Sequence, residues 1–298
     1  PPIYLRVTQS DDRKKVIRQV VDGQQRVSAV LDFITCKFAL SNTLDASYAG
    51  KRYDKLTDKE QDRIRHYSFI CEVFHGASDA DILEVFARLN TYSVKLNDQE
   101  LRNGKYFGYF KQLAYRLARE YIEFWRQNRI CTDQNIARML EVELTSELLV
   151  ATLDGLQDKK KSIDRFYAEY DETPILRRTQ FEARFRSTID AIAESLLDTL
   201  AQSQFRRPPL FYTLFCAVYH HLHGLPKQSV ATPRAPLTKG DQESLARAVV
   251  KLSETIERAK AKEPIPSAYA TFINACSRQT DNIRPRQTRF SQLYKDAF

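Results

Sequence analysis

The spacing of hydrophobic and polar positions changes along the chain. Residues 2–7 and 15–21 contain short extended patterns with β-branched side chains, which are typical of strands. The second pattern runs through Asp22-Gly23 into a segment, residues 24–40, with helical spacing. Its apolar positions are Val27, Val30, Leu31, Ile34 and Phe38. The pattern therefore predicts a strand, a tight glycine turn and a helix.

Three more short elements follow before residue 105. Thr57-Asp58-Lys59-Glu60 has the capping-box pattern and predicts a short helix towards His66. Apolar and aromatic residues over 67–74 favour a returning strand, and a helix is expected over 80–89. Asn97 is expected to cap another helix through Asn103, which Gly104 would end.

Beyond residue 105 the pattern predicts helices and no convincing strand. The expected helices are 106–128, 133–154, 160–170, 176–205, 209–223, 240–262 and 265–277. The fold class is therefore α+β. A small domain with a short mixed sheet is expected over 1–120, followed by a larger all-helical domain over 121–298 with a basic C-terminal tail.

Composition excludes several classes of protein. Only eight of the 298 residues are glycine, and their positions fit neither the Gly-rich dinucleotide fingerprint nor the Walker A loop. The five cysteines form no CxxC pair, so no structural zinc site is expected. His220, His221 and His223 close an apolar helix, where their interaction with its dipole is favoured over metal binding. No apolar run approaches the ~18 residues of a membrane span, and no secretory signal is visible. These observations predict a cytoplasmic protein without a membrane partner.

The formal net charge is +8, and the excess is modest and scattered except at the C-terminal end, where residues 278–298 carry +3. Aromatic residues are interleaved there with Arg278, Arg284, Arg286 and Arg289. Such arginines favour contacts with nucleic-acid phosphates, which predicts DNA as a partner. Two alternatives remain: a solvated helix end with scattered ion pairs, or a tail that folds back and supplies an arginine to a bound nucleotide.

The glycine turn has the strongest chemical argument. A strand that ends in a glycine turn and opens a helix exposes the first helical N–H groups, which favours an anion such as phosphate. Arg26 supplies a two-pronged donor to phosphate oxygens. Asp22 is placed to hold Mg²⁺ or orient a water, and Gln24 and Gln25 to position a nucleophile or to bind base or ribose. The alternative is purely structural: Asp22 caps the helix and Gly23 relieves a tight corner.

Two sequence blocks resemble a known family. Val21-Asp22-Gly23-Gln24-Gln25-Arg26, followed by Val27-Ser28-Ala29-Val30, resembles the DGQQR signature of the GmrSD restriction endonuclease N-terminal family. This family belongs to the ParB-like nuclease and nucleotide-binding group. Phe86-Ala87-Arg88-Leu89-Asn90 and then Leu96-Asn97-Asp98-Gln99-Glu100-Leu101-Arg102-Asn103 resemble its second block. The resemblance covers about residues 1–120. It implies that an arginine- and aromatic-bearing segment, which precedes the first strand in the family, is missing here.

The resemblance implies a ParB-like domain that binds a nucleoside triphosphate with Mg²⁺, the base being unknown. The catalytic residues would be Asp22, Gln24, Gln25 and Arg26, with Asp22 holding the metal. The nucleotide-binding residues would be Gly23, Arg26, Ser28, Arg88, Asn90, Glu100 and Asn103. For the second block a structural alternative remains, with Asn90 as a helix stop and Glu100 paired with Arg102 or Arg88.

The function that this implies is an NTP-hydrolysing component of a bacterial anti-phage or modification-dependent restriction system. One alternative is a ParB-like DNA-binding module in which nucleotide is only a switch, and another is a structural interaction protein. No HNH-type arrangement is visible, so nuclease activity of this chain alone is not expected. A separate nuclease subunit or a second copy of the chain is the expected protein partner.

Overall fold

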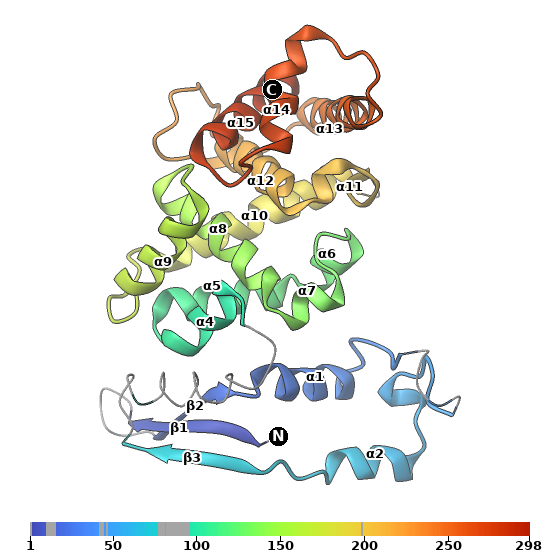
Figure 1. Ribbon diagram of the computed structural model, residues 1–298, viewed down its shortest axis with the longest axis vertical. Helices are drawn as coiled ribbons and strands as arrows, with labels where there is room; N and C mark the ends of the chain where they lie inside the picture. The colour runs from blue at the N-terminus through green and yellow to red at the C-terminus, as the bar shows by residue number, and fades with distance from the viewer. Residues whose placement is uncertain are drawn as a thin grey trace. The chain divides into compact units, whose positions relative to one another are not determined.

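A computed structural model of the chain describes residues 2–9, 16–41, 45, 47–76, 81, 96–197 and 199–298. The chain divides into two compact units, residues 1–96 and residues 97–298. The first contains a three-stranded sheet and the second consists of helices (Figure 1). The predicted α+β class is thus confirmed.

The sheet of the N-terminal unit is mixed, as predicted. Its strands β1 (Ile3–Gln9), β2 (Val16–Asp22) and β3 (Cys71–His75) lie in the order β2-β1-β3. The central strand β1 pairs antiparallel with β2 and parallel with β3. The strand expected over 67–74 starts later, at Cys71, because the pairing with β1 begins at Ile3 opposite Cys71.

Short helices accompany this sheet. They are α1 (Gln24–Ile34), the single turn η1 (Tyr53–Lys55) and α2 (Asp58–Arg65). Phe33 of α1, Tyr53 and Leu56 form a small buried cluster. The predicted capping box of α2 is present, because the Thr57 side chain accepts from the Glu60 N–H and the Glu60 carboxylate accepts from the Thr57 N–H. The helix expected over 80–89 lies outside the described residues, apart from Asp81.

The two units divide between Leu96 and Asn97, earlier than the expected boundary near residue 120. The reason is the attachment of α4 (Asp98–Lys105) to the helical unit. Gln99 donates a 2.8 Å hydrogen bond to the Tyr167 hydroxyl, and Arg102 donates a 2.6 Å bond to Asp164. Asn97 caps α4 as predicted, whereas Gly104 lies within the helix and does not end it.

The helical unit continues with a long series of short and medium helices. They are α5 (Tyr109–Glu120), α6 (Ile122–Gln127), α7 (Asp133–Ala137), α8 (Leu140–Asp154), α9 (Lys159–Glu169), α10 (Arg178–Leu196), α11 (Thr199–Gln202), η2 (Gln204–Arg206), α12 (Pro208–His223), α13 (Lys239–Lys260), η3 (Ser267–Tyr269), α14 (Ala270–Ser277) and α15 (Ile283–Ala297). Several expected helices are divided. Met139 has a φ of 59° and separates α7 from α8, and Leu197, with a φ of 33°, ends α10. A left-handed residue interrupts the helical hydrogen bonds, and the hydrophobic spacing does not reveal it.

Helix α12 is the centre of the core of the helical unit. Every residue from Leu210 to His221 is buried, and α12 packs against α8, α10 and α15 (Figure 1). Phe211 of α12 meets the ring of Trp125 edge-on, with centroids 5.5 Å apart. No helix in the described part of the chain is long and apolar enough to cross a membrane.

The histidines at the end of α12 are held as neutral bases. His220 Nδ1 accepts from the Leu225 N–H at 3.0 Å, so Nε2 carries the proton and donates to the Val230 carbonyl at 2.9 Å. Burial lowers the pKa of His220 and of His221, and burial together with the charge of Arg184 lowers the pKa of His223 to about 4. At neutral pH these imidazoles therefore bring little positive charge to the helix dipole. Nor does any group of three or more potential metal ligands occur in the described ranges.

Acidification is expected to destabilise the helical unit. Because the unfolded chain takes up protons near pH 6.5 and the folded His223 does so near pH 4, the free energy of unfolding falls as the pH drops through this window. We expect His223 to contribute a loss of about 1 kcal/mol between pH 7 and pH 5, allowing for its partial exposure. Urea unfolding at both pH values measures it, and His223→Gln should reduce the loss. An unchanged pH dependence in the variant would contradict this assignment.

Candidate functional site

Gly23 determines the path of the chain from β2 into α1. It is the N-cap of α1 and has a φ of 94°, in the left-handed region that favours glycine. A Cβ atom at this position would lie 2.5 Å from Cδ1 of Ile3 and 3.0 Å from a terminal nitrogen of Arg26. The predicted strand, glycine turn and helix are thus confirmed, and a side chain at position 23 would collide with the end of the Ile3 side chain.

The start of α1 has no capping side chain. Gly23 cannot supply one, and the first turn of the helix contains no acidic residue. Gln24, Gln25 and Arg26 form that turn, Ser28 follows within the next turn, and all four side chains are partly exposed. The partial positive charge at the helix start is therefore not compensated within its first turn, which favours a bound anion. The suggestion that Asp22 is merely the N-cap is not supported, because Gly23 occupies that position.

Arg26 connects three segments of the turn. One terminal nitrogen donates to the Pro2 carbonyl at 2.8 Å and to Oδ2 of Asp22 at 3.1 Å. The Arg26 side chain is 33% exposed and that of Asp22 is 45% exposed, so both remain accessible to a ligand. Arg26 thus stabilises the junction of β1, β2 and α1 and also places its guanidinium at the candidate anion site.

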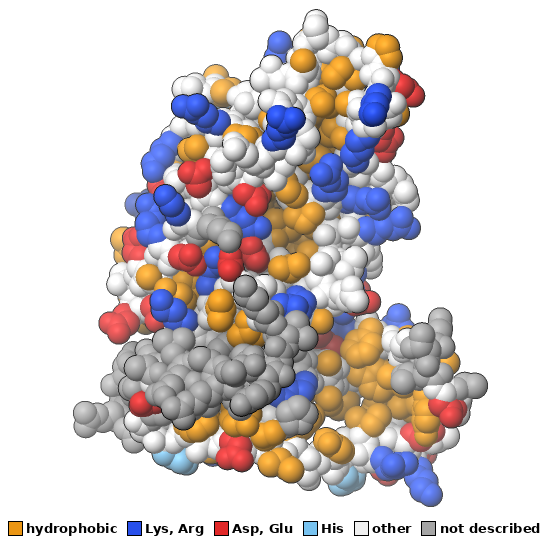
Figure 2. All heavy atoms as spheres, viewed as in Figure 1, with side chains coloured by type: hydrophobic (Ala, Val, Ile, Leu, Met, Phe, Trp, Pro, Cys, Tyr) orange, Lys and Arg blue, Asp and Glu red, His pale blue; other side chains and the backbone are white. Residues whose placement is uncertain are grey.

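A pocket of about 800 Å³ begins at Arg26 and continues along α1 towards α2. Its walls are mainly apolar, and Figure 2 shows hydrophobic side chains gathered in the region of α1. The α1 residues are Ala29, Val30 and Ile34, and the other lining residues are Leu40, Tyr48, Leu56, Glu60, Arg63, Ile64, Arg65, Tyr67 and Phe69. A volume of this size falls in the usual range of small-molecule sites.

The charged residues that line this pocket differ in their hydrogen-bond and ion-pair partners. Glu60 accepts from the Thr57 N–H and hydroxyl, which lowers the pKa of its carboxyl group. Arg65 pairs with Asp62 at 2.6 Å, whereas Arg63 has no ion-pair partner within the described ranges. Sequence reasoning missed this pocket. Its signal is the pair of arginines at 63 and 65 followed by the aromatic residues Tyr67 and Phe69, a pattern that fits a helix end and the start of a strand equally well.

The structure does not place the described site residues of the second sequence block in the unit of the Gly23 turn. Arg88 and Asn90 lie outside the described residues. Glu100 accepts two hydrogen bonds from Arg138, of 2.7 and 2.9 Å, whereas Arg102 donates to Asp164. The Asn103 carbonyl accepts from Lys111 at 2.6 Å. Glu100 and Asn103 therefore support the helical unit, and their contribution to a nucleotide site stays a prediction.

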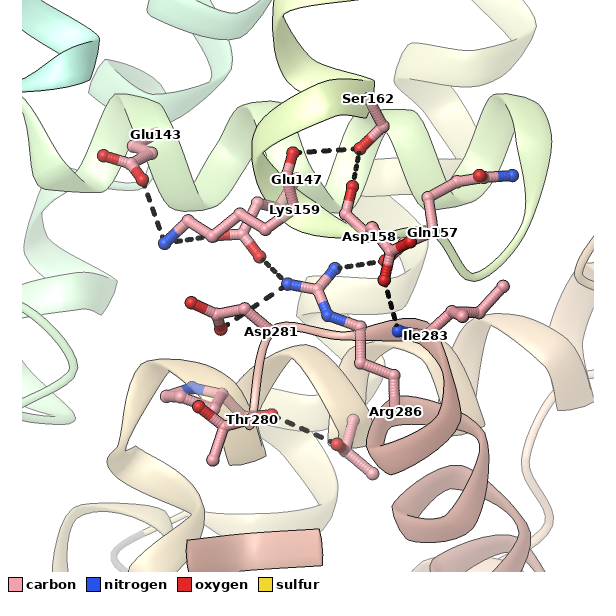
Figure 3. A network of polar contacts seen from close by, with 12 residues as sticks. Glu143, Glu147, Gln157, Asp158, Lys159, Ser162, Thr280, Asp281, Ile283 and Arg286 are labelled. Carbon is pink, nitrogen blue, oxygen red and sulfur yellow. Dashed lines mark hydrogen bonds and ion pairs between the residues drawn. The ribbon is translucent and has the colours of Figure 1, made fainter. Parts of the chain in front are cut away.

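Most of the basic C-terminal segment forms helix α15, and two of its four arginines are buried. Arg286 is 2% exposed and Arg289 is fully buried, so the prediction that they contact nucleic acid is wrong. Arg286 donates to the Glu147 carboxylate and, at 3.1 Å, to the Gln157 carbonyl, and Lys159 pairs with Glu147 and Glu143 (Figure 3). A buried guanidinium needs such partners because desolvation of an unpaired charge is costly.

The buried guanidinium of Arg289 donates hydrogen bonds to neutral acceptors and not to a carboxylate. Its three nitrogens donate to the Thr213 hydroxyl at 3.1 Å and to the carbonyls of Ala275 and Thr280, each at 2.7 Å. Burial consequently lowers the pKa of its guanidinium. Arg278 and Arg284 differ from this pair because both are exposed.

Comparison with known proteins identifies the N-terminal part of the chain. Residues 1–107 match the family described as "GmrSD restriction endonuclease, N-terminal domain". The match agrees with the resemblance that the sequence blocks of this part predicted. No curated protein and no solved structure gives a significant match to the chain.

Replacement of Gly23 is expected to destabilise the N-terminal unit. Gly23→Ala places a methyl group against Ile3 and imposes a left-handed conformation on alanine, which together should cost about 2 kcal/mol. Chemical unfolding monitored by circular dichroism measures the loss. Gly76→Ala is a matched control, since Gly76 also has a positive φ but a methyl group there would meet no atom within 4 Å. Equal losses in the two variants would show that contact with Ile3 is unimportant.

Loss of the Arg286 guanidinium is expected to destabilise the helical unit. Arg286→Met leaves Glu147 in the core with Lys159 as its remaining cationic partner, and we expect a loss of about 3 kcal/mol in urea unfolding. Arg284→Ala on the same helix is the control and should change stability by less than about 0.5 kcal/mol, because Arg284 is exposed. Similar stabilities for Arg286→Met and the wild type would refute a stabilising role for this network.

Proposed function

We propose that the N-terminal unit binds a nucleoside triphosphate at the Asp22–Arg26 turn and hydrolyses it as part of a restriction system. The observation that carries this proposal is the combination of the uncapped start of α1 with the pocket beside it. The helix start and Arg26 supply donors and positive charge for phosphate oxygens. The adjoining apolar pocket offers a place for the rest of the nucleotide.

The base is expected to occupy the pocket. Arg26 lies at its beginning, so a nucleotide with its phosphates at the helix start extends its base along α1 towards Ile34. Tyr67 and Phe69 line the pocket with exposed ring surface, against which a base can stack. Inorganic tripolyphosphate lacks the base and should therefore bind at least 10-fold more weakly than a nucleoside triphosphate.

Asp22 fits a role with Mg²⁺. The ion is usually held by one or two carboxylates together with substrate phosphates, and the Asp22 carboxylate is half-exposed beside the candidate phosphate site. When bound, Mg²⁺ supplies positive charge that neutralises the phosphates. Arg26 then stabilises charge that develops on the transferred phosphate, and Gln24 or Gln25 orients the attacking water.

Substitution of Arg26 should separate catalysis from the fold. Removal of a donor to developing charge typically costs about 100-fold in rate, so Arg26→Ala should lower phosphate release by at least that factor. Because Arg26 also bonds to Pro2 and Asp22, Arg26→Lys is the second variant, which keeps the charge but loses the two-pronged geometry. Both are compared with Arg18→Ala, which removes an exposed arginine of β2 in the same unit.

The experiment uses a panel of nucleoside triphosphates with Mg²⁺ and reads thermal stabilisation and phosphate release together. Stabilisation and turnover in the wild type and in Arg18→Ala, with turnover lost in both Arg26 variants, would support the proposal. Stabilisation without phosphate release would favour nucleotide as a switch. Undiminished turnover in a folded Arg26→Ala variant, or no response to any nucleotide, would overturn it.

A further inference from the structure

A second hollow, of about 470 Å³, lies on the helical unit between α14 and α15. It is lined mainly by polar side chains that contain hydrogen-bond donors, and none of its described lining residues is acidic. They are Thr271, Asn274, Arg278, Gln279, Arg284 and Thr288. Arg278 follows directly after α14, and Arg284 is the second residue of α15, so the connection between the two helices brings the arginines to one hollow.

The guanidinium groups of the two arginines in this hollow differ from those of the buried arginines on α15. Neither guanidinium makes an ion pair or a hydrogen bond with any residue that the structure describes. This distinguishes them from Arg286, which bonds to Glu147, and from Arg289, which bonds to Thr213 and two carbonyls. The nearby carboxylate of Asp281 lies 3.8 Å from the buried Arg286 and is not among the residues of the hollow.

The remaining polar groups add donors to the same space. The side chains of Asn274, Gln279, Thr271 and Thr288 also have no hydrogen-bond partner within the described ranges. Helix α15 begins beside the hollow with no acidic residue in its first turn, and its first N–H, that of Ile283, donates to the Asp158 carboxylate at 2.7 Å. The hollow therefore has unused donors and two positive charges, with no carboxylate among its described lining residues to neutralise them.

We propose that this hollow binds a phosphate group. Arginine presents planar paired donors that match phosphate oxygens, and amide and hydroxyl side chains are common additional phosphate ligands. The volume is larger than one phosphate group, so the site takes a phosphate that is attached to a larger molecule. A nucleic-acid backbone and a small phosphorylated compound share this chemistry. The site lies in the helical unit, and it does not depend on nucleotide binding at the Asp22–Arg26 turn.

The test is to remove both charges in the full-length chain. The Arg278→Ala/Arg284→Ala variant is compared with Lys239→Ala/Lys295→Ala, which removes two exposed lysines of the same unit and thus the same net charge. A fluorescent 20-base-pair duplex is titrated by anisotropy at several salt concentrations, and inorganic tripolyphosphate by calorimetry. All four substituted side chains are exposed, so thermal unfolding should remain unchanged.

We expect the arginine variant to bind at least 10-fold more weakly and the lysine variant to bind as the wild type does. If the duplex is the ligand, the slope of log affinity against log salt should fall by about 0.9 for each arginine. An effect on tripolyphosphate alone would identify a small phosphorylated ligand. Absence of binding to both probes, or equal losses in the two variants, would overturn the proposal. Arg26→Ala should leave this binding intact, which keeps the test separate from that of the N-terminal site.

Discussion

The close approach of Gly23 to Ile3 is the constraint on which the candidate site of the N-terminal unit depends. With no Cβ at position 23, β2 turns directly into α1 while β1 lies against the turn. The same turn leaves the start of α1 without a capping side chain and brings Arg26 back to Asp22 and Pro2. The geometry of the helix start, the position of the guanidinium and the mouth of the pocket therefore follow from one backbone conformation.

The part of the fold that is local in sequence was predictable. Short sequence patterns predict β1, the β2–Gly23–α1 turn and the capped starts of α2 and α4, because the interacting groups are only a few residues apart. The boundary between the units was not predictable in this way. It depends on Gln99 and Arg102, whose partners Tyr167 and Asp164 lie more than sixty positions later in the chain.

The C-terminal arginines also show that local patterns are predictable from sequence, whereas contacts between distant segments are not. Helical spacing places Arg286 and Arg289 on the face that also carries Phe290, Leu293 and Tyr294, and this face is buried. The pattern was thus available once the segment was taken as a helix. The partner that makes burial of Arg286 tolerable, Glu147, lies on α8 and cannot be inferred from the segment itself. A cluster of arginines in a sequence therefore does not by itself define a basic surface.

The two units differ in the size of their hydrophobic cores, and this difference affects how strongly a ligand would stabilise each unit. The described residues of the N-terminal unit bury few large apolar side chains, among them Phe33, Tyr53 and Leu56, whereas the helical unit has an extensive core around α12. A unit with a small core has little stability in reserve. A ligand that binds only the folded state raises the free energy of unfolding by an amount that grows with the ratio of ligand concentration to Kd. For a unit of low stability, this increase is a larger fraction of the total free energy of unfolding. A nucleotide bound at the Gly23 turn, as proposed, would therefore have a larger relative effect on the stability of its own unit than a phosphate bound between α14 and α15 would have on the helical unit.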